Sequence, residues 1–195
     1  MNDEKSKLEK KVEEGAYGEP ELKKGEKDRF LGEFKERVIK YLTYDQVVEP
    51  GTYPQIKKAI KHPQARKLVL AREVNESEYP RYMERAQEYI DLAHDNNLSF
   101  KRVSSPDFKG EIALVVVSDR AVNVKKRKII NREERLKNLG ISDTIIKNVG
   151  SKLCKDCWNE LKEKAPAEID NYEKLSWIDR LTGIKCINCQ SKNKD

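Results

Sequence analysis

The cysteines of this 195-residue chain form two Cys-x-x-Cys pairs close to its C-terminal end. The first pair is Cys154 and Cys157, and the second is Cys186 and Cys189. A Cys-x-x-Cys turn presents two thiolates to one metal ion, and two such turns complete the tetrahedral shell that zinc prefers. Since the chain has only two histidines, both far from the pairs, the sequence predicts one zinc ion per chain held by the four cysteines alone.

A four-cysteine shell leaves no coordination position for water, which indicates a structural rather than a catalytic zinc site. A short C-terminal segment buries too little surface to fold alone, so the metal would supply much of its folding free energy. Two other chemistries stay open. One is a dithiol redox pair, although the thioredoxin-like βαβ unit that usually carries such a pair is missing. The other is iron, because four thiolates also bind iron and iron–sulfur clusters.

The 28 residues between the two pairs contain the material for a small core. We expect a helix directly after Cys157, with Trp158 and Leu161 on its apolar side. The later segment "LSWIDRLTGI" should cover the metal and pack against that helix. Its apolar side chains are Trp177, Ile178, Leu181 and Ile184.

Positive charge is concentrated in residues 120–137, which carry eight basic and two acidic side chains in a chain of net charge +6. Crowded cations bind phosphate backbones by releasing counterions, so we interpret this segment as a contact surface for structured RNA or the ribosome. Aromatic residues for stacking unpaired bases are missing between Arg120 and Trp158. The alternative is a solvated linker, or an edge strand whose lysines prevent aggregation. The candidate contact residues are Arg120, Lys125, Lys126, Arg127, Lys128, Arg132 and Arg135.

The sequence contains none of the short motifs that mark nucleotide-binding folds, phosphate-binding loops, zinc proteases or serine hydrolases. We therefore interpret the chain as a non-enzymatic binding protein. Two alternatives stay open: a zinc-stabilised protein–protein adaptor, and a small-molecule-binding or enzymatic α/β domain. For the last, Asp119 and Arg120 lie at the C-terminal end of the central apolar strand, where α/β folds often place ligands.

The longest apolar run, Ile112 to Val117, is far shorter than the ~18 residues of a membrane helix. The N-terminus has no apolar stretch of the kind found in signal peptides. We expect a cytoplasmic protein without a membrane partner. In a reducing cytosol, close cysteine pairs bind metal more readily than they form structural disulfides.

The elements that must position these residues alternate between helix and strand, which predicts an α/β domain. The three- and four-residue spacing of Phe30, Leu31, Phe34, Val38, Tyr41 and Leu42 predicts a helix, preceded by a loop over residues 15–28. We expect a strand or turn over 46–51, a short helix over 53–63 and a strand over 67–71. A long helix from Ser77 to Asn97, a strand over 99–104 and a central strand over 111–119 follow. Two short helices begin near Asn131 and Ser142.

Two stretches of this domain have a familiar pattern. The first is "GAYGEPELKKGEKDRFLGEFKERVIKYLTYDQV", from Gly15 to Val47, and the second is "IALVVVSDRAVN", from Ile112 to Asn123. Together they resemble the YueI-like family of Gram-positive bacterial proteins over roughly residues 12–124. The resemblance implies a mixed-sheet α/β sandwich similar to the Bacillus chorismate mutase-like group, which includes ribosomal proteins that bind kink-turn RNA. It implies no catalytic residue, because the family has no established activity.

The cysteine pairs depart from that family, whose shorter members end soon after the Ala-Val-Asn stretch. We therefore expect a small C-terminal zinc module added to a YueI-like domain. The expected boundaries are a charged N-terminal segment over residues 1–14, the α/β domain over 15–130 and a helical connector over 131–149. The four-cysteine module covers 150–190, and 191–195 form a tail.

Overall fold

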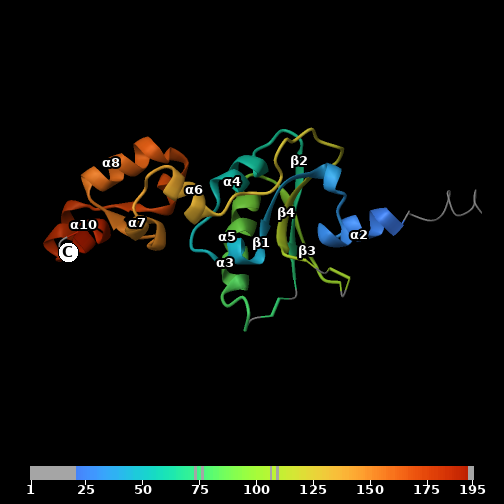
Figure 1. The fold of residues 1–195 in the computed structure, drawn as a ribbon, viewed down its shortest axis with the longest axis horizontal. Coiled ribbons are helices and arrows are strands. Elements are labelled where there is room, and N and C mark those ends of the chain that lie inside the picture. Colours follow the sequence, from blue (N-terminus) through green and yellow to red (C-terminus); the bar gives the residue numbers. More distant parts are fainter. Residues whose placement is uncertain (1–20, 73, 76, 106, 109, 193–195) are drawn as a thin grey trace, which may run out of the picture.

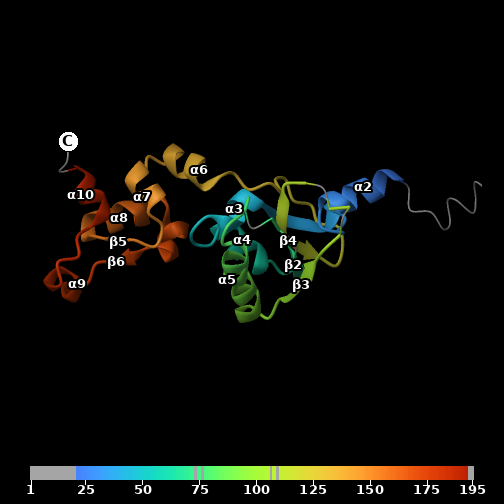
Figure 2. The same ribbon diagram turned by 90° about the horizontal axis from the view of Figure 1, so that it is seen from below.

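The computed structural model describes residues 21–72, 74–75, 77–105, 107–108 and 110–192. These residues form an α/β part and a smaller helical C-terminal part, which lie side by side along the long axis of the molecule (Figures 1 and 2). The charged N-terminal segment expected over 1–14 and the first residues of the family motif lie outside the described residues, as do the last three residues of the tail.

The α/β part contains one four-stranded mixed sheet with the order β1-β4-β2-β3. Its strands are β1 (Val38–Thr43), β2 (Ala65–Ala71), β3 (Ser99–Val103) and β4 (Ile112–Ser118). Strand β4 is antiparallel to both β1 and β2, whereas β2 and β3 are parallel. All seven residues of β4 are buried, which confirms the prediction of a central apolar strand.

Both faces of the sheet are covered. The helices α3 (Tyr44–Val48), α4 (Pro54–Ile60) and α5 (Tyr82–Asp95) pack on one face, where Leu68, Leu114 and Val116 point. The other face receives the alternate residues Val69, Val115 and Val117, together with Phe30 and Leu31. This alternation follows from the two-residue period of a strand. Helix α2 (Glu21–Arg29) leads into the segment that covers the second face.

Three local predictions in the first 51 residues are wrong. The predicted amphipathic helix of residues 30–42 is a turn, a short 3₁₀ helix η1 (Lys35–Arg37) and strand β1. The β-branched Val38 and Ile39 are both buried there because β1 is covered on its two faces, a position that a strand fills better than a helix. Part of the predicted loop forms α2, and the predicted strand or turn near Gln46 forms α3, which a Thr43–Gln46 capping box starts.

Most later elements are confirmed. Helix α4 begins with a proline in its first turn, β2 and β3 lie where expected, and α5 begins at Tyr82 rather than Ser77. The side chains of Asn131 and Ser142 cap α6 (Arg132–Asn138) and α7 (Asp143–Lys147). No helix among the described residues is long and apolar enough to span a membrane.

The C-terminal part has its own core. It contains α6, α7, α8 (Lys155–Lys164), the 3₁₀ helix η2 (Pro166–Asn171), α9 (Trp177–Leu181) and α10 (Ile187–Lys192). Two short parallel strands, β5 (Lys152–Leu153) and β6 (Glu173–Lys174), hold it together. The segment that we expected to be a connector contributes Leu136, Ile141 and Ile145 to this core, which also includes Cys157 and Cys186.

A buried polar contact joins the two parts. The Asn171 side chain pairs with the backbone of Thr52, accepting from its N–H at 3.0 Å and donating to its carbonyl at 2.9 Å. At Gly51, which has φ +73°, a Cβ atom would lie 2.7 Å from Asn171 Oδ1, so this approach needs glycine. The Tyr53 hydroxyl accepts from the Arg132 N–H at 3.2 Å and donates to Glu49 at 2.8 Å.

Candidate metal centre

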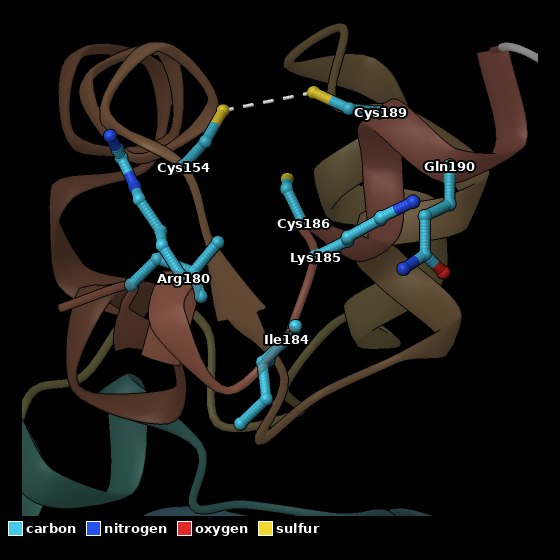
Figure 3. Close-up of a pocket in the computed structure, with 9 residues that line it drawn as sticks. Cys154, Arg180, Ile184, Lys185, Cys186, Cys189 and Gln190 are labelled. Carbon is cyan, nitrogen blue, oxygen red and sulfur yellow. Dashed lines mark hydrogen bonds between the residues drawn. The ribbon is translucent and has the colours of Figure 1, made fainter. Parts of the chain in front are cut away.

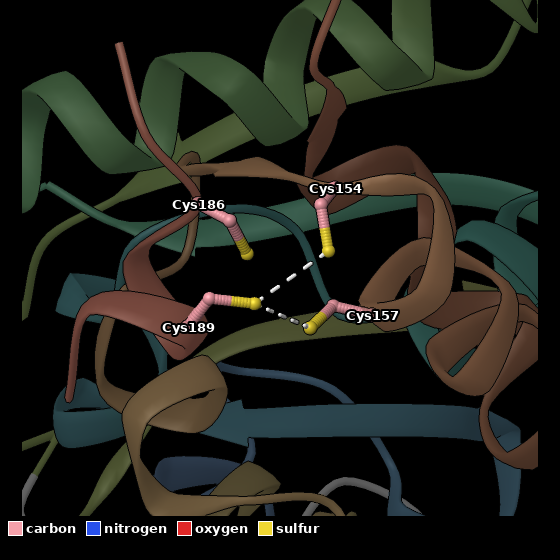
Figure 4. Close-up of side chains that lie close together, drawn as sticks. All are labelled: Cys154, Cys157, Cys186 and Cys189. Carbon is pink, nitrogen blue, oxygen red and sulfur yellow. Dashed lines mark hydrogen bonds between the residues drawn. The ribbon is translucent and has the colours of Figure 1, made fainter. Parts of the chain in front are cut away.

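The four cysteines predicted to bind one metal ion come together in the C-terminal part. Their Sγ atoms all lie within 4.8 Å of one another (Figure 4). Cys189 Sγ lies 3.7 Å from Cys154 Sγ and 3.9 Å from Cys157 Sγ. A tetrahedron with zinc–sulfur bonds of about 2.3 Å has edges of about 3.8 Å, so the cluster has the dimensions of a four-thiolate site.

Each pair is presented by the first turn of a helix. Cys154 is the N-cap of α8 and Cys157 lies in the first turn of that helix, whereas Cys186 precedes α10, which contains Cys189. The Trp158 N–H donates to the Cys154 carbonyl at 2.9 Å, and the corresponding bond of the second pair, from Gln190 to Cys186, measures 3.1 Å. The two pairs therefore have similar local geometry and face each other across the site.

A polar side chain beside the sulfur atoms holds the cluster in place. The Asn188 amide donates to Cys157 Sγ at 3.3 Å, and the Ser142 hydroxyl donates to the Asn188 carbonyl oxygen at 2.7 Å. Asn188 is buried, and Ser142 also caps α7 by accepting from the Ile145 N–H. Such outer contacts orient metal ligands and stabilise their charged form. Asn188 was not among the predicted site residues, because its only signal in the sequence is its position inside a Cys-x-x-Cys turn.

Without a cation, the pKa values of Cys157 and Cys186 are shifted in opposite directions. Burial raises the pKa of Cys157 to about 12, and its contacts with Cys154 and Cys186 add to the rise. Burial also acts to raise the pKa of Cys186, but backbone N–H groups of Cys154, Cys189 and Asn188 outweigh it and lower this pKa to about 7. A bound dication would compensate the charge of the whole cluster and favour the thiolate at every position.

One side of the cluster faces a pocket of about 670 Å³ (Figure 3). Cys154, Cys186 and Cys189 line this pocket. Cys189 is exposed, whereas Cys157 and Cys186 are buried. The prediction that four apolar side chains cover this metal site is wrong, because all four are exposed. The exposed fractions are 70% for Trp177, 54% for Ile178, 75% for Leu181 and 44% for Ile184.

Three of the seven predicted phosphate contacts instead hold the protein together. Arg127 donates to the carbonyls of Val38 at 2.9 Å, Val122 at 2.9 Å and Val124 at 3.2 Å, and so fastens the basic segment to β1. The side chain of Arg132 is only 3% exposed, which removes it from the surface.

Arg132 and Arg135 belong to the contact between the two parts of the chain. Arg132 donates to the Pro50 carbonyl and pairs with Glu49 at 3.6 Å and with Glu168 at 3.5 Å. Arg135 pairs with the same Glu168 carboxylate. Counting charges in the sequence could not show this, because the count does not distinguish a buried guanidinium group from an exposed one.

The other four predicted contacts, Arg120, Lys125, Lys126 and Lys128, are exposed. Lys128 lies 3.5 Å from Glu111, in an exposed ion pair. Asp119 pairs with Arg66 at 3.4 Å and with Arg120 at 3.6 Å, so the two groups expected at a ligand site pair within the protein.

Two of these exposed lysines, Lys125 and Lys128, line a basic cavity of about 540 Å³ beside α2. Its cationic lining residues are Arg29, Lys35, Lys125, Arg127 and Lys128, and among the described residues that line it Glu26 is the one carboxylate. Nearby, burial and the charges of Lys126 and Lys58 lower the pKa of Lys40, which is a sign of crowded positive charge. Arg29 and Lys35 were missed by the sequence analysis because they lie about 90 residues before the basic segment.

Comparisons with known proteins match the α/β part. The family model described as "Protein of unknown function (DUF1694)" matches residues 5–128. The uncharacterized protein YueI of Bacillus subtilis (strain 168) is 29% identical over 112 residues, which are 57% of this chain and 80% of YueI. The crystal structure of the YueI protein from Bacillus subtilis is 28% identical, covers 65% of this chain and 93% of its own, and has a TM-score of 0.49. The matched family range ends before the four cysteines.

Proposed function

Because the chain belongs to the DUF1694 family of proteins of unknown function, we propose its role from its own surfaces. It is a non-enzymatic binding protein in which a structural zinc ion stabilises the C-terminal part. The exposed basic side chains Arg120, Lys125, Lys126 and Lys128, together with the basic cavity, contact the phosphates of structured RNA.

The zinc assignment is supported by the chemistry of the donor set. Four sulfur atoms within 4.8 Å suit a soft or borderline ion, and zinc takes such shells in tetrahedral structural sites. The C-terminal core contains two of the four cysteines, so metal binding and packing would stabilise the same structure.

The observation that carries the RNA proposal is the basic cavity. It gathers cations from two segments distant in sequence, residues 29–35 and 125–128, and its described lining residues include a single carboxylate, Glu26. A concave surface lined by positive charge raises the local electrostatic potential, and a phosphate backbone that binds there gains free energy from the release of its counterions. The predicted likeness to the Bacillus chorismate mutase-like group, with its kink-turn RNA binders, favours the same partner and stays a prediction.

Salt dependence tests this proposal. With about four to six phosphate contacts, log K for a structured RNA should fall against log salt with a slope of about −3 to −5. The triple variant Lys125→Gln, Lys126→Gln, Lys128→Gln should flatten the slope by about 2 to 3 and weaken different RNAs alike, because phosphate contacts carry no sequence information.

The matched control replaces three exposed lysines elsewhere, Lys101, Lys155 and Lys162, by glutamine. It removes the same charge and should leave the slope within about one unit of the original. Equal slopes for the original chain and the triple variant at Lys125, Lys126 and Lys128 would refute the RNA proposal.

A further inference from the structure

Four large exposed apolar side chains of the C-terminal part are grouped on and directly after α9, and this surface is here called the α9 face: Trp177, Ile178, Leu181 and Ile184. They fall within eight consecutive residues and are between 44% and 75% exposed. The other large exposed apolar side chains among the described residues, Met83, Phe100, Ile130 and Leu139, are spread along the chain. Gathered apolar exposure of this kind marks an interaction site more often than scattered exposure does.

The α9 face is held outward by a firm anchor on its polar side. Ser176 and Asp179 form a reciprocal capping box at the start of α9. Asp179 is buried and accepts from Lys152 of β5 at 2.6 Å. This hydrogen bond, with two more from Ser176, lowers the pKa of Asp179 to about 2. Since the polar side of α9 is fixed to β5, its apolar side is directed to solvent by the fold itself.

The pocket beside the cysteines continues the α9 face. Leu175 and Ile184 line it, and Arg180 and Lys185 lie on opposite sides of it (Figure 3). No carboxylate is among the described residues that line this pocket. A segment that entered it would therefore meet an apolar floor between two positive charges.

We propose that the α9 face and this pocket dock an acidic amphipathic segment of a protein partner. Its apolar side chains would cover the α9 face, and its carboxylates would pair with Arg180 and Lys185. The chemistry favours this occupant over two others. Three of the four apolar side chains are aliphatic, which suits a protein better than stacked RNA bases. A second copy of the chain would bring the same cations against each other across a two-fold axis.

Two synthetic helices of about 18 residues, or five turns, serve as probes. Both carry leucines on one side, and the other side carries glutamates in one helix and lysines in the other. Measured by fluorescence anisotropy on the zinc-loaded chain, the acidic helix should bind at least tenfold more tightly. Ile178→Ser with Leu181→Ser should weaken it at least tenfold, and Arg180→Glu with Lys185→Glu should reverse the charge preference.

The control for lost apolar surface is Met83→Ser with Phe100→Ser, which lies outside the α9 face and should leave binding unchanged. Zinc content and circular dichroism show that each variant is folded. Equal binding of the two helices, or no binding of either, overturns the proposal. Tight binding of polyuridine that is lost in Trp177→Ala would also overturn it, because the α9 face would then bind RNA. A dimer that dissociates in the variant Ile178→Ser with Leu181→Ser would overturn it in favour of a second copy of the chain. The RNA proposal is tested independently, because its test changes Lys125, Lys126 and Lys128, which lie outside the α9 face.

Discussion

Replacing Glu168 should destabilise the contact between the two parts of the chain more than any exposed substitution. Its side chain is fully buried and pairs with both Arg132 and Arg135. It also accepts a hydrogen bond from the Asn171 amide at 2.7 Å. Glu168→Ala would leave the Arg132 guanidinium, itself 3% exposed, with Glu49 at 3.6 Å as its remaining carboxylate.

Removing one partner of a buried ion pair costs about 3–5 kcal/mol, because the other charge stays buried without compensation. We expect Glu168→Ala to lower the free energy of unfolding by that amount. Glu168→Gln, which keeps an acceptor for Asn171 and loses the charge, should cost roughly 1–3 kcal/mol. The exposed Glu163 of α8 is the matched control, and its replacement by alanine should change stability by less than about 0.5 kcal/mol.

Urea unfolding of the zinc-loaded protein measures these differences. The only two tryptophans, Trp158 and Trp177, lie in the C-terminal part, so their fluorescence follows that part while far-ultraviolet circular dichroism follows the whole chain. Adding Arg132→Met to Glu168→Ala should give a smaller loss than the sum of the two single changes, by about 1–3 kcal/mol. A loss below about 1 kcal/mol for Glu168→Ala would show that the buried pairs do not stabilise this contact.

Three further outcomes are expected. Cys186→Ser should abolish metal binding and unfold the C-terminal part, while the α/β part keeps a cooperative unfolding transition of its own. Limited proteolysis should therefore stop near the start of α6, and degradation of the whole chain would contradict this. Asn188→Ala should weaken metal affinity by about 10–100-fold in a chelator competition, because Cys157 loses its amide donor; unchanged affinity would show that this contact is dispensable. Arg127→Gln should lower the free energy of unfolding by about 2–4 kcal/mol, because it removes hydrogen bonds to three carbonyls. The same change at its exposed neighbour Lys126 should lower it by less than about 0.5 kcal/mol, and equal thermal stability of the two variants would contradict the structural role of Arg127.

The sequence predicted the features that depend on local spacing. Two Cys-x-x-Cys turns need only two helix starts that face each other, and the four sulfur atoms lie together as expected. The apolar run from Ile112 to Val117 is so continuous that only a buried central strand accommodates it, and β4 occupies that position.

Features that depend on depth could not be predicted. The spacing of Phe30, Leu31 and Val38 fits a helix as well as a turn followed by a strand. The strand forms because all three side chains pack against the sheet, which is a tertiary contact that spacing does not show. The sequence also does not show whether a basic side chain is exposed to solvent or, like that of Arg132, is buried between the carboxylates of Glu49 and Glu168. The exposure of Trp177 depends on the anchor between Lys152 and Asp179, which are distant in the sequence.

The metal content of the purified chain tests the central claim most directly. Protein prepared under reducing conditions without added metal should contain about one zinc ion per chain by elemental analysis. Removal of that zinc with a chelator should unfold the C-terminal part, seen in the fluorescence of its two tryptophans. A folded C-terminal part without metal, two disulfides formed under reducing conditions, or stoichiometric iron in place of zinc would contradict the claim that these four cysteines form a structural zinc site.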